Sequence, residues 1–392
     1  MKLAVIVALL SVLFLSPLES WGSAAEFRGI WVITWEIFQE NGTILQGEKL
    51  KVRIGKILDN VKKAGLNAVI WQVRQSGTAY YPSTFEPWGR YIGERSPGFD
   101  PVAFALDEAH KRGLSFHAWF NSFESMSKAA GSAATQHPTW IATDKAGKVM
   151  PKFFCLSPGI AEAREYLAEL IGGFVSHYAV DGVHLDYIRW NEYRWTDMAA
   201  DFEKEGDGGY GEFLYDLQHP FSKGVPAGFA TWDVWRREMV TEAVTLIRTT
   251  INRTRPNVTL SMAAIGKYNW GIWNGYHAVF QDAALWLKLG LVDQIMAMNY
   301  QWTTAAEMSG GLEGNCPNCW LDYLQDGLNL GGNFSAGIAS YRLAPLNLWA
   351  NHQPLVMAVR QSTWAAGMQF FSYGIWEEKN YFEEARKLLF PL

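Results

Sequence analysis

The chain has 392 residues, of which 49% are hydrophobic and 19% charged, so it can bury a sizeable core and is not a disordered protein. Its 34 basic and 39 acidic side chains give a net charge of -5, without the basic excess that is typical of proteins that bind nucleic acid. The 19 tryptophans exceed what core packing usually requires, and their flat apolar faces suit stacking on a ligand.

The first segment, residues 1–25, is predicted to be a signal peptide. A basic start leads into an apolar run over residues 3–15, and Ser23, Ala24 and Ala25 form a small-residue cleavage site. The run is shorter than the roughly 20 residues that span a bilayer, so an uncleaved membrane anchor is the less favoured alternative. No cysteine lies near the cleavage site, which argues against a lipid-anchored form. We therefore expect a secreted or periplasmic protein with no stable membrane span.

From residue 26 to residue 392, short apolar runs alternate with amphipathic helical segments. The predicted strands cover residues 27–34, 67–73, 115–120, 182–186, 258–263, 294–300, 336–340 and 368–373. The predicted helices cover residues 49–64, 101–112, 161–178, 232–252, 278–289, 320–329, 354–365 and 380–389. Strict alternation requires right-handed parallel crossovers, and eight repeats close into a (β/α)8 TIM barrel. A single barrel domain over residues 26–392 accounts for the whole pattern.

Long connections follow four of the predicted strands, at residues 74–100, 121–160, 187–231 and 266–277. In a (β/α)8 barrel the loops after the strands gather on the C-terminal face, which carries the active site, so long loops there suit a large substrate. An open doubly wound sheet is the runner-up fold. It usually has a glycine-rich phosphate-binding turn after its first strand, where this chain has Ile33-Thr34-Trp35-Glu36.

The strongest catalytic candidate is Asp186, which closes an apolar strand at the end from which barrel enzymes present their acids. The alternation of side chains along a strand places His184 on the same side, one layer lower. An ion pair of Asp186 with Arg189 or Arg74 is the plain alternative to catalysis. Asp181, which precedes the strand, is interpreted as a structural cap.

Several blocks of sequence occur in a characteristic order. They are RGIWV at residues 28–32, LNAVIWQVR at 66–74, YYPS at 80–83, FDP at 99–101, AHKRGL at 109–114, HAWFN at 117–121, LSPG at 156–159 and VDGVHLDYIRW at 180–190. In these blocks, and more weakly at 290–293 and 298–300, the chain resembles the glycosyl-hydrolase-like family 10 proteins. The resemblance implies a (β/α)8 barrel, export, and hydrolysis of bacterial or other polysaccharide glycan strands.

Hydrolysis of a glycosidic bond normally takes two carboxyl groups, one giving a proton to the leaving oxygen and one acting as nucleophile or base. The sequence offers Asp186 clearly as one of the two groups, without deciding which role it has, and Glu36, at the end of the first strand, is our first choice for the other. The other candidates are Glu124, Asp282, Glu377 and Glu378. Each of these also fits a solvated loop charge or a helix-start acid. On a substrate with an N-acetyl group the neighbouring amide can replace the nucleophile, so that one acid is enough.

Substrate-binding side chains are expected where strands end, to bind sugar hydroxyl groups or stack on a sugar ring. They are Gln72, Arg74, His117, Trp119, Asn121, His184, Tyr187, Arg189, Asn299, Tyr300, Trp302 and Trp376. Packing in the barrel core is an equal alternative for His117 and His184, and packing at the rim is an equal alternative for Trp302 and Trp376. Arg74 could bind an acidic substituent of the sugar. The block at 298–300 also resembles the tyrosine-bearing strand of chitinase-type barrels, but residues 187–189 lack the glutamate of the chitinase pattern.

The three cysteines predict one structural disulfide bond. Cys316 and Cys319 are expected to close a small disulfide loop, and a thioredoxin-type redox pair is the less favoured alternative because the pattern lacks its helix start. Cys155 would then be a free, buried thiol. The sequence has no metal-binding helix, serine-hydrolase elbow or phosphate-binding loop, so we expect neither a metal nor another cofactor.

Together these features predict an exported, endo-acting glycoside hydrolase whose substrate is a polysaccharide or oligosaccharide. The alternatives are a non-catalytic carbohydrate-binding barrel and a polysaccharide lyase or deacetylase, although the missing metal set counts against a deacetylase. About half of the tryptophans are expected on the loop-bearing face. They are Trp35, Trp88, Trp119, Trp140, Trp190, Trp195, Trp270, Trp273, Trp302 and Trp376.

Overall fold

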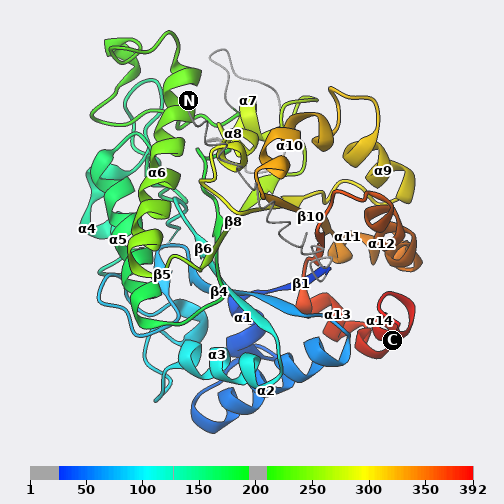
Figure 1. Cartoon of the computed structure of the whole chain (residues 1–392). Coiled ribbons are helices and arrows are strands. Elements are labelled where there is room, and N and C mark those ends of the chain that lie inside the picture. Colours follow the sequence, from blue (N-terminus) through cyan, green and yellow to red (C-terminus); the bar gives the residue numbers. More distant parts are fainter. Residues whose placement is uncertain (1–25, 127, 194–209, 392) are drawn as a thin grey trace, which may run out of the picture.

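The computed structural model describes residues 26–126, 128–193 and 210–391, and eight parallel strands form a closed barrel at its centre (Figure 1). The strands are β1 (Phe27–Val32), β4 (Ala68–Gln75), β6 (Ser115–Asn121), β7 (Gly182–Asp186), β8 (Thr259–Ile265), β9 (Gln294–Met298), β10 (Asn333–Ile338) and β11 (Gly367–Phe370). Strand β1 pairs with both β4 and β11, and Gly29 is in register with Ala68 on one side and Gln369 on the other. The predicted (β/α)8 TIM barrel is confirmed.

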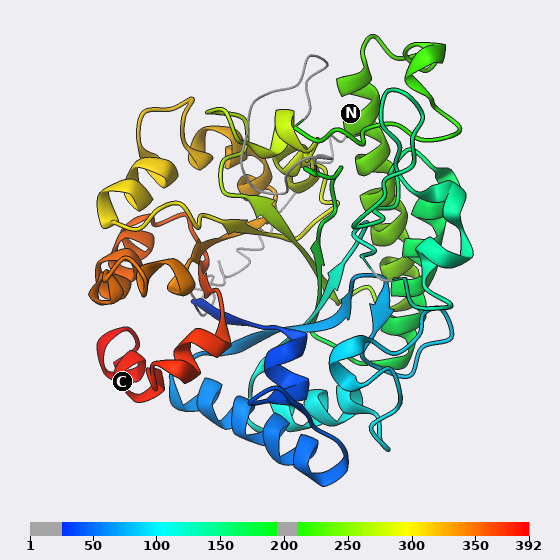
Figure 2. The same ribbon diagram turned by 180° about the vertical axis from the view of Figure 1, so that it is seen from behind.

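Helices surround the strands on the outside of the barrel, as the view from behind also shows (Figure 2). The main ones are α2 (Gly47–Lys63), α3 (Pro101–Lys111), α5 (Ala161–His177), α6 (Trp232–Thr254), α8 (Ala283–Lys288), α10 (Trp320–Asn329), α12 (His352–Gln361) and α14 (Phe382–Leu388). All eight predicted helices are present. The fifth begins at Ala283 rather than at residue 278, because the Asp282 side chain caps it by accepting a hydrogen bond from Leu285 N.

Shorter elements in the connections were not predicted. They are β2 (Gln39–Glu40), β3 (Thr43–Ile44), β5 (Thr78–Ala79), α1 (Thr34–Phe38), α4 (Ala133–Gln136), α7 (Gly275–Ala278), α9 (Ala305–Glu313), α11 (Ser340–Leu343), α13 (Tyr373–Glu378), and the 3-10 turns η1 (Arg90–Ile92), η2 (Pro138–Trp140), η3 (Phe221–Lys223) and η4 (Trp349–Asn351). Strand β1 ends before Thr34, because Glu36 caps a helical turn there by accepting from Ile33 N.

Alternation along each strand separates two buried layers. On β1, Ile30 and Val32 pack in the large layer between the strands and the helices, whereas Trp31 and Ile33 pack inside the barrel. The interior layer also contains Trp119, so bulky side chains fill the barrel below its C-terminal end. Side chains at the last inward position of each strand are therefore held at the mouth.

Cys316 and Cys319, between α9 and α10, form the expected disulfide, with a Cα–Cα distance of 5.0 Å, and Cys155 is a free, buried cysteine. In the described part of the chain, no helix has both the length and the hydrophobicity needed to span a bilayer. The predicted signal peptide and Trp195 lie outside the described residues.

Candidate active site

The carboxyl ends of β6 and β7 place polar side chains at one level of the barrel. Asn121 and Asp186, the last residues of these strands, are partners in the parallel register, and Trp119 and His184 are partners one layer below. Because side chains alternate along a strand, all four point into the barrel, and all four are buried. The two strands thus present an amide and a carboxyl group together at the face that carries the active sites of (β/α)8 enzymes.

Asp186 is a buried carboxyl group with a cation on its own loop. It is 5% exposed, and its Oδ1 accepts a hydrogen bond from Tyr187 N at 2.7 Å and lies 3.4 Å from Arg189 Nη1. Burial raises the pKa of Asp186, while the Arg189 charge and the Tyr187 amide oppose the increase. The ion pair considered as an alternative to catalysis therefore forms with Arg189. It leaves the second carboxyl oxygen, Oδ2, outside this pair.

A second buried carboxyl group, Glu124, lies on the loop that follows β6. Asn121 Nδ2 donates a hydrogen bond to its Oε2. Burial raises the pKa of Glu124 to about 7, the Asn121 hydrogen bond opposes the increase, and the charge of Asp186 adds to it. The structure thus brings together Asp186, Asn121 and Glu124, with the two carboxyl groups near enough for their charges to interact.

A chain of hydrogen bonds fixes the orientation of Glu124. Thr34 N donates to Gln72 Oε1 at 3.1 Å, Gln72 Nε2 donates to Asn121 Oδ1 at 3.2 Å, and Asn121 donates in turn to Glu124. A backbone N–H can only donate, so each amide in the chain has one consistent orientation. Gln72 and Asn121 were predicted to bind substrate, and the structure gives them a positioning role toward Glu124.

The loop after β7 holds Arg189 between two acids. Arg189 Nη2 lies 3.4 Å from Glu192 Oε1, and its guanidinium carbon lies 4.2 Å from the centre of the Tyr187 ring. Tyr187 has a φ of 49°, which is uncommon for a bulky residue and turns the chain sharply at the mouth of the barrel. Sequence reasoning missed Glu192, although a second acid on the loop that begins with Asp186 was the available signal.

Aromatic rings form the floor and one side of the mouth. Trp31 packs edge-to-face on Trp119 with ring centres 4.7 Å apart, and Phe371 lies 5.7 Å from Trp31 and 5.4 Å from Tyr300. The Tyr300 hydroxyl group is buried and has no hydrogen-bond partner among the described residues. Burial raises its pKa, and the charge of Asp186 contributes to the increase. Phe371 was not singled out from the sequence, although it follows Gln369 with the period of an inward-facing strand residue.

Glu36, the first choice for the second acid, is engaged elsewhere. Its Oε2 accepts from Ile33 N at 2.9 Å, and its Oε1 accepts from Ser372 Oγ at 2.6 Å and from Gly374 N at 2.8 Å. Burial raises the pKa of Glu36 to about 7, and these hydrogen bonds oppose the increase. None of the three partners belongs to β6, β7 or the loops that follow them. The structure therefore uses Glu36 to tie α1 to the turn between β11 and α13, and does not bring it together with Asp186.

Arg74 is fully buried as part of an internal clamp. It forms an ion pair with Glu86 at 2.6 Å, in which neither side chain is exposed, and donates to the carbonyl oxygen of Ser122 at 2.8 Å. Tyr166 Oη donates to the same glutamate at 3.2 Å. The guanidinium group is therefore buried and already bound by groups on the loops after β4 and β6. It cannot make the predicted contact with a sugar or an acidic substituent, because none of it is exposed.

The two histidines of the barrel lie in its packed interior. His117 Nε2 lies 3.1 Å from Ser115 Oγ, and His184 Nδ1 lies 2.9 Å from Ser261 Oγ. Burial lowers the pKa of His117 to about 4 and also lowers that of His184, so both are neutral near pH 7. The core-packing alternative accounts for both residues.

Asn299, predicted to bind substrate, instead joins three strand ends. Its Nδ2 donates to Gly266 O at 2.9 Å after β8, and its Oδ1 accepts from Gly337 N at 3.3 Å on β10. The side chain is fully buried. These bonds satisfy backbone groups where the strands diverge, and they position the neighbouring Tyr300.

The structure does not bring Trp302 and Trp376 to the mouth of the barrel. Trp302 is 7% exposed and its ring packs against Gly311 of α9. Trp376 is fully buried in α13, and its Nε1 donates to Ser340 Oγ at 2.8 Å. Trp376 lies in α13, which begins at Tyr373 soon after β11, and Trp302 lies in the connection before α9, with its ring turned toward that helix. Both tryptophans therefore pack in the buried layer under the helices, which differs from both alternatives considered for them, sugar stacking and packing at the rim.

The remaining acids also have structural partners. Asp282 caps α8 and accepts from Tyr268 Oη at 2.6 Å. Glu377 pairs with Arg53 at 2.5 Å, while Glu378 is exposed on the surface. Within the described ranges, no group of three or more histidine, cysteine, aspartate or glutamate side chains is arranged to hold a metal ion.

Comparison with known proteins adds sequence and fold relationships. The glycosyl hydrolase-like 10 family model matches residues 26–314. Glycosyl hydrolase YngK of Bacillus subtilis is 30% identical over 305 residues, which are 71% of this chain and 54% of that protein. Glycosyl hydrolase DigH of Escherichia coli K12 is 28% identical over 327 residues, which are 72% of this chain and 67% of that protein. The chain thus spans about half the length of YngK and two thirds of DigH.

Among solved structures, the glycoside hydrolase domain of PgaB (BpsB) from Bordetella bronchiseptica superimposes with a TM-score of 0.58 over 93% of this chain and 99% of that domain. The two sequences are 15% identical, so the likeness is one of fold.

Proposed function

The chain belongs to the glycosyl hydrolase-like 10 family, and we propose that it hydrolyses O-glycosyl bonds of a polysaccharide or glycan strand with Asp186 and Glu124 as its carboxyl pair. A glycosidase-type enzyme is what the family and the fold support. The observation that carries the proposal is that two buried carboxyl groups with different partners meet at the C-terminal end of the barrel. Two such groups are what hydrolysis of a glycosidic bond requires.

The environments of the two carboxyl groups assign their roles. Glu124 has its pKa raised to about 7, so it retains a proton at and below neutral pH and serves as the general acid for the leaving oxygen. Burial raises the pKa of Asp186 as well, but the cationic Arg189 and the Tyr187 amide beside it oppose this increase and stabilise the carboxylate. Asp186 therefore acts as the nucleophile at the anomeric carbon, or as the base that takes a proton from the attacking water.

The bonds broken and formed are accounted for in both possible reactions, a single and a double displacement. The bond from the anomeric carbon to the leaving oxygen breaks as Glu124 protonates that oxygen. In a single displacement, water adds to the carbon and gives its proton to Asp186. In a double displacement, Asp186 first forms a glycosyl ester, and water then cleaves it while Glu124 takes the proton. The buried, unpartnered Tyr300 hydroxyl is a donor for a sugar oxygen beside this centre.

We further propose that the enzyme cuts within a strand and acts outside the cytoplasm. The long loops after β4, β6 and β7 support a site for an extended substrate. The basic start, apolar run and small-residue site in residues 1–25 support export to the periplasm or medium.

The test is a glycan panel with chitin-type, peptidoglycan-type and neutral plant or algal polymers, incubated with the protein from residue 26 onward. Release of new reducing ends from one polymer, abolished in Asp186→Asn and in Glu124→Gln but not in the exposed-acid control Glu378→Gln, supports the proposal. Binding without release from any polymer would favour a carbohydrate-binding barrel. Unsaturated products would indicate a lyase, and acetate release without reducing ends a deacetylase.

A further inference from the structure

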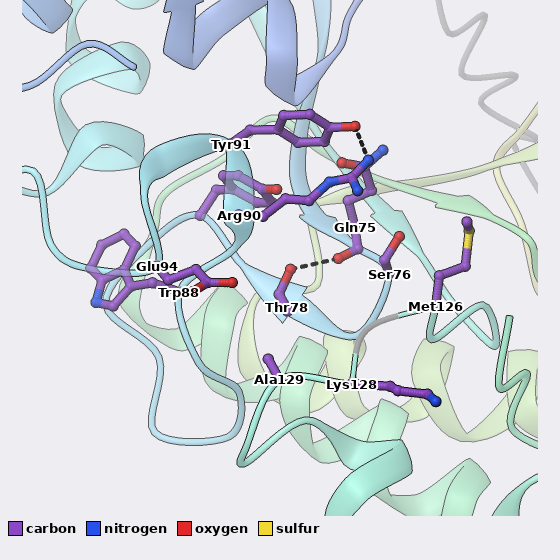
Figure 3. A pocket seen from close by; sticks show the side chains of 11 residues that line it. Gln75, Ser76, Thr78, Trp88, Arg90, Tyr91, Glu94, Met126, Lys128 and Ala129 are labelled. Carbon is purple, nitrogen blue, oxygen red and sulfur yellow. Dashed lines mark hydrogen bonds between the residues drawn. The ribbon is translucent and has the colours of Figure 1, made fainter. Parts of the chain in front are cut away.

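A cavity of about 420 Å³ lies between the loop after β4 and the loop after β6, beside the mouth of the barrel (Figure 3). Its lining includes Gln75, Thr78, Trp88, Arg90, Tyr91 and Lys128. Figure 3 shows Gln75 and Thr78 between Tyr91 on one side and Lys128 on the other. The volume falls in the range of pockets that hold small organic ligands, on the order of 300–1,000 Å³.

The hairpin of β4 and β5 forms the base of the cavity. Ser76 and Gly77 have φ values of 56° and 74°, which make the tight turn that reverses the chain between these strands. Thr78 Oγ1 donates to Gln75 O at 2.8 Å and stabilises the turn. The polar side chains at the base are therefore held on a rigid element, which favours a preformed binding site.

Hydrogen bonds connect the cavity to the carboxyl pair. Thr34 Oγ1 donates to Gln75 Oε1 at 2.6 Å at the base of the cavity, and Thr34 N donates to Gln72 Oε1 at 3.1 Å in the chain that ends on Glu124. On the opposite wall, Met126 follows Glu124 on the same loop. A glycan strand that leaves the carboxyl pair between these two loops would continue into the cavity.

The wall of the cavity has the chemistry that sugars require. The guanidinium carbon of Arg90 lies 4.5 Å from the centre of the Tyr91 ring, and the ring of Trp35, 41% exposed, packs against Tyr91 with centres 5.5 Å apart. Arg90 and Glu94 are exposed at the rim. Within the cavity lining, the partly buried rings of Trp88 and Tyr91 lie beside charged and hydroxyl groups, and this combination matches a sugar, which has apolar faces and polar edges.

We propose that this cavity is a second glycan-binding subsite, which holds a sugar unit of the same strand away from the bond that is cut. The proposal rests on the proposed glycan substrate and adds to it a preference for long chains. Binding of a remote sugar unit contributes affinity only when the strand is long enough to reach from the carboxyl pair to the cavity.

The experiment measures binding by calorimetry in the Asp186→Asn background, so that turnover does not interfere. The probes are disaccharides and octasaccharides of the chitin, peptidoglycan and neutral β-glucan types. In one series we expect the octasaccharide to bind at least about 10-fold more tightly than the disaccharide. Adding Arg90→Ala and Tyr91→Ala together should reduce the ratio of the two affinities about 10-fold, because one stacked ring and its hydrogen bonds are lost. The matched control is Arg95→Ala, an exposed arginine on the same loop outside the cavity lining, which leaves the ratio unchanged.

A second variant, Arg90→Ala with Glu94→Ala, changes only exposed side chains and serves if the loss of Tyr91 lowers the melting temperature. The subsite is overturned if no series shows a preference for the octasaccharide, or if that preference persists in both cavity variants. The two proposals fail separately. If the variants abolish the chain-length preference but the wild type releases no reducing ends, the subsite is supported and the hydrolase is contradicted. If the wild type hydrolyses the glycan but the variants keep the chain-length preference, the hydrolase is supported and the subsite is contradicted.

Discussion

Asn121 and Asp186 end neighbouring strands at the same level of the barrel, and the amide of Asn121 holds Glu124. The spacing of the two acids therefore depends on the pairing of β6 with β7, which also continues beyond the strands, since Ser122 N donates to Asp186 O at 2.7 Å. A register set by many backbone hydrogen bonds is rigid, and this rigidity is what a catalytic pair requires.

Removing either carboxyl group is expected to abolish hydrolysis with little effect on binding. Asp186→Asn and Glu124→Gln keep the shape of each side chain but remove nucleophile or base function and proton donation, so kcat should fall by about 10²–10⁴-fold or more. The measurement is reducing-end release together with calorimetric binding of the same glycan. Glu378→Gln, at an exposed acid, is the control. Retention of more than a tenth of the wild-type rate in Glu124→Gln would remove Glu124 from the mechanism.

The pH profile should report the proton of Glu124. Its pKa is raised to about 7, and the acid must be protonated, so kcat/KM is expected to fall as the pH rises through about 7. The Asn121 hydrogen bond opposes that increase in pKa. Asn121→Ala should therefore move the alkaline limb to higher pH while kcat decreases. Gln294→Ala, which removes a buried amide from β9, should leave the limb in place. An alkaline limb unmoved in Asn121→Ala would contradict the assignment.

The fold could be predicted almost entirely from the sequence because its signals are local. Alternation of strand and helix, and caps such as Asp100 before α3, depend on neighbouring residues. The alternation of side chains along a strand also predicted that Asp186 and Asn121 lie at strand ends with their side chains directed into the barrel. That prediction needs only the two-residue period of the strand and the position of its last residue.

The second acid could not be predicted in this way. Glu36 and Glu124 both follow a strand directly, and what distinguishes them is their partners. Glu36 is bound by Ser372 and Gly374, which lie more than 300 positions away in the sequence and reach it only when β11 closes the barrel against β1. Trp376 was misjudged for a related reason, since the helix that follows β11 turns its ring outward to Ser340.

Stability should depend on pH through Glu36. Burial raises the pKa of this carboxyl group from its ordinary 4.5 to about 7, so the folded protein binds the proton more tightly than the unfolded chain does. The contribution to stability is fully present below pH 4.5 and is lost as the pH rises through about 7, on the order of 3 kcal/mol for a shift of this size. Urea unfolding of Glu36→Gln from pH 4.5 to pH 8 should show a smaller decrease than the wild type. The Glu36→Gln variant should also be less stable overall, because its amide nitrogen cannot accept a hydrogen bond from the N–H or O–H donor that it then faces among Ile33 N, Ser372 Oγ and Gly374 N. Parallel curves for the two proteins would refute the assignment.

The buried pair of Arg74 and Glu86 should behave as a unit. Arg74→Met leaves the Glu86 carboxylate buried without a cation and is expected to cost about 3–5 kcal/mol in the free energy of unfolding. Adding Glu86→Leu should recover most of this loss. The control is Lys288→Ala, which breaks an exposed pair with Asp326 and should cost less than about 1 kcal/mol. If the double variant were less stable than Arg74→Met, the pair would not be the cause of the loss.

The way in which β1 closes the barrel has a practical consequence for handling the protein. Glu26, just before β1, pairs with Arg360 at 2.7 Å, and the guanidinium carbon of Arg28 lies 5.3 Å from the centre of the Phe390 ring, so both ends of the described chain meet at the amino-terminal ends of the strands. Asp186, and the cavity between the loops after β4 and β6, are at the other end of the barrel. A tag or bead attached at either end would hold the molecule by its base, with the mouth directed toward the surrounding solution, where an insoluble glycan could approach it.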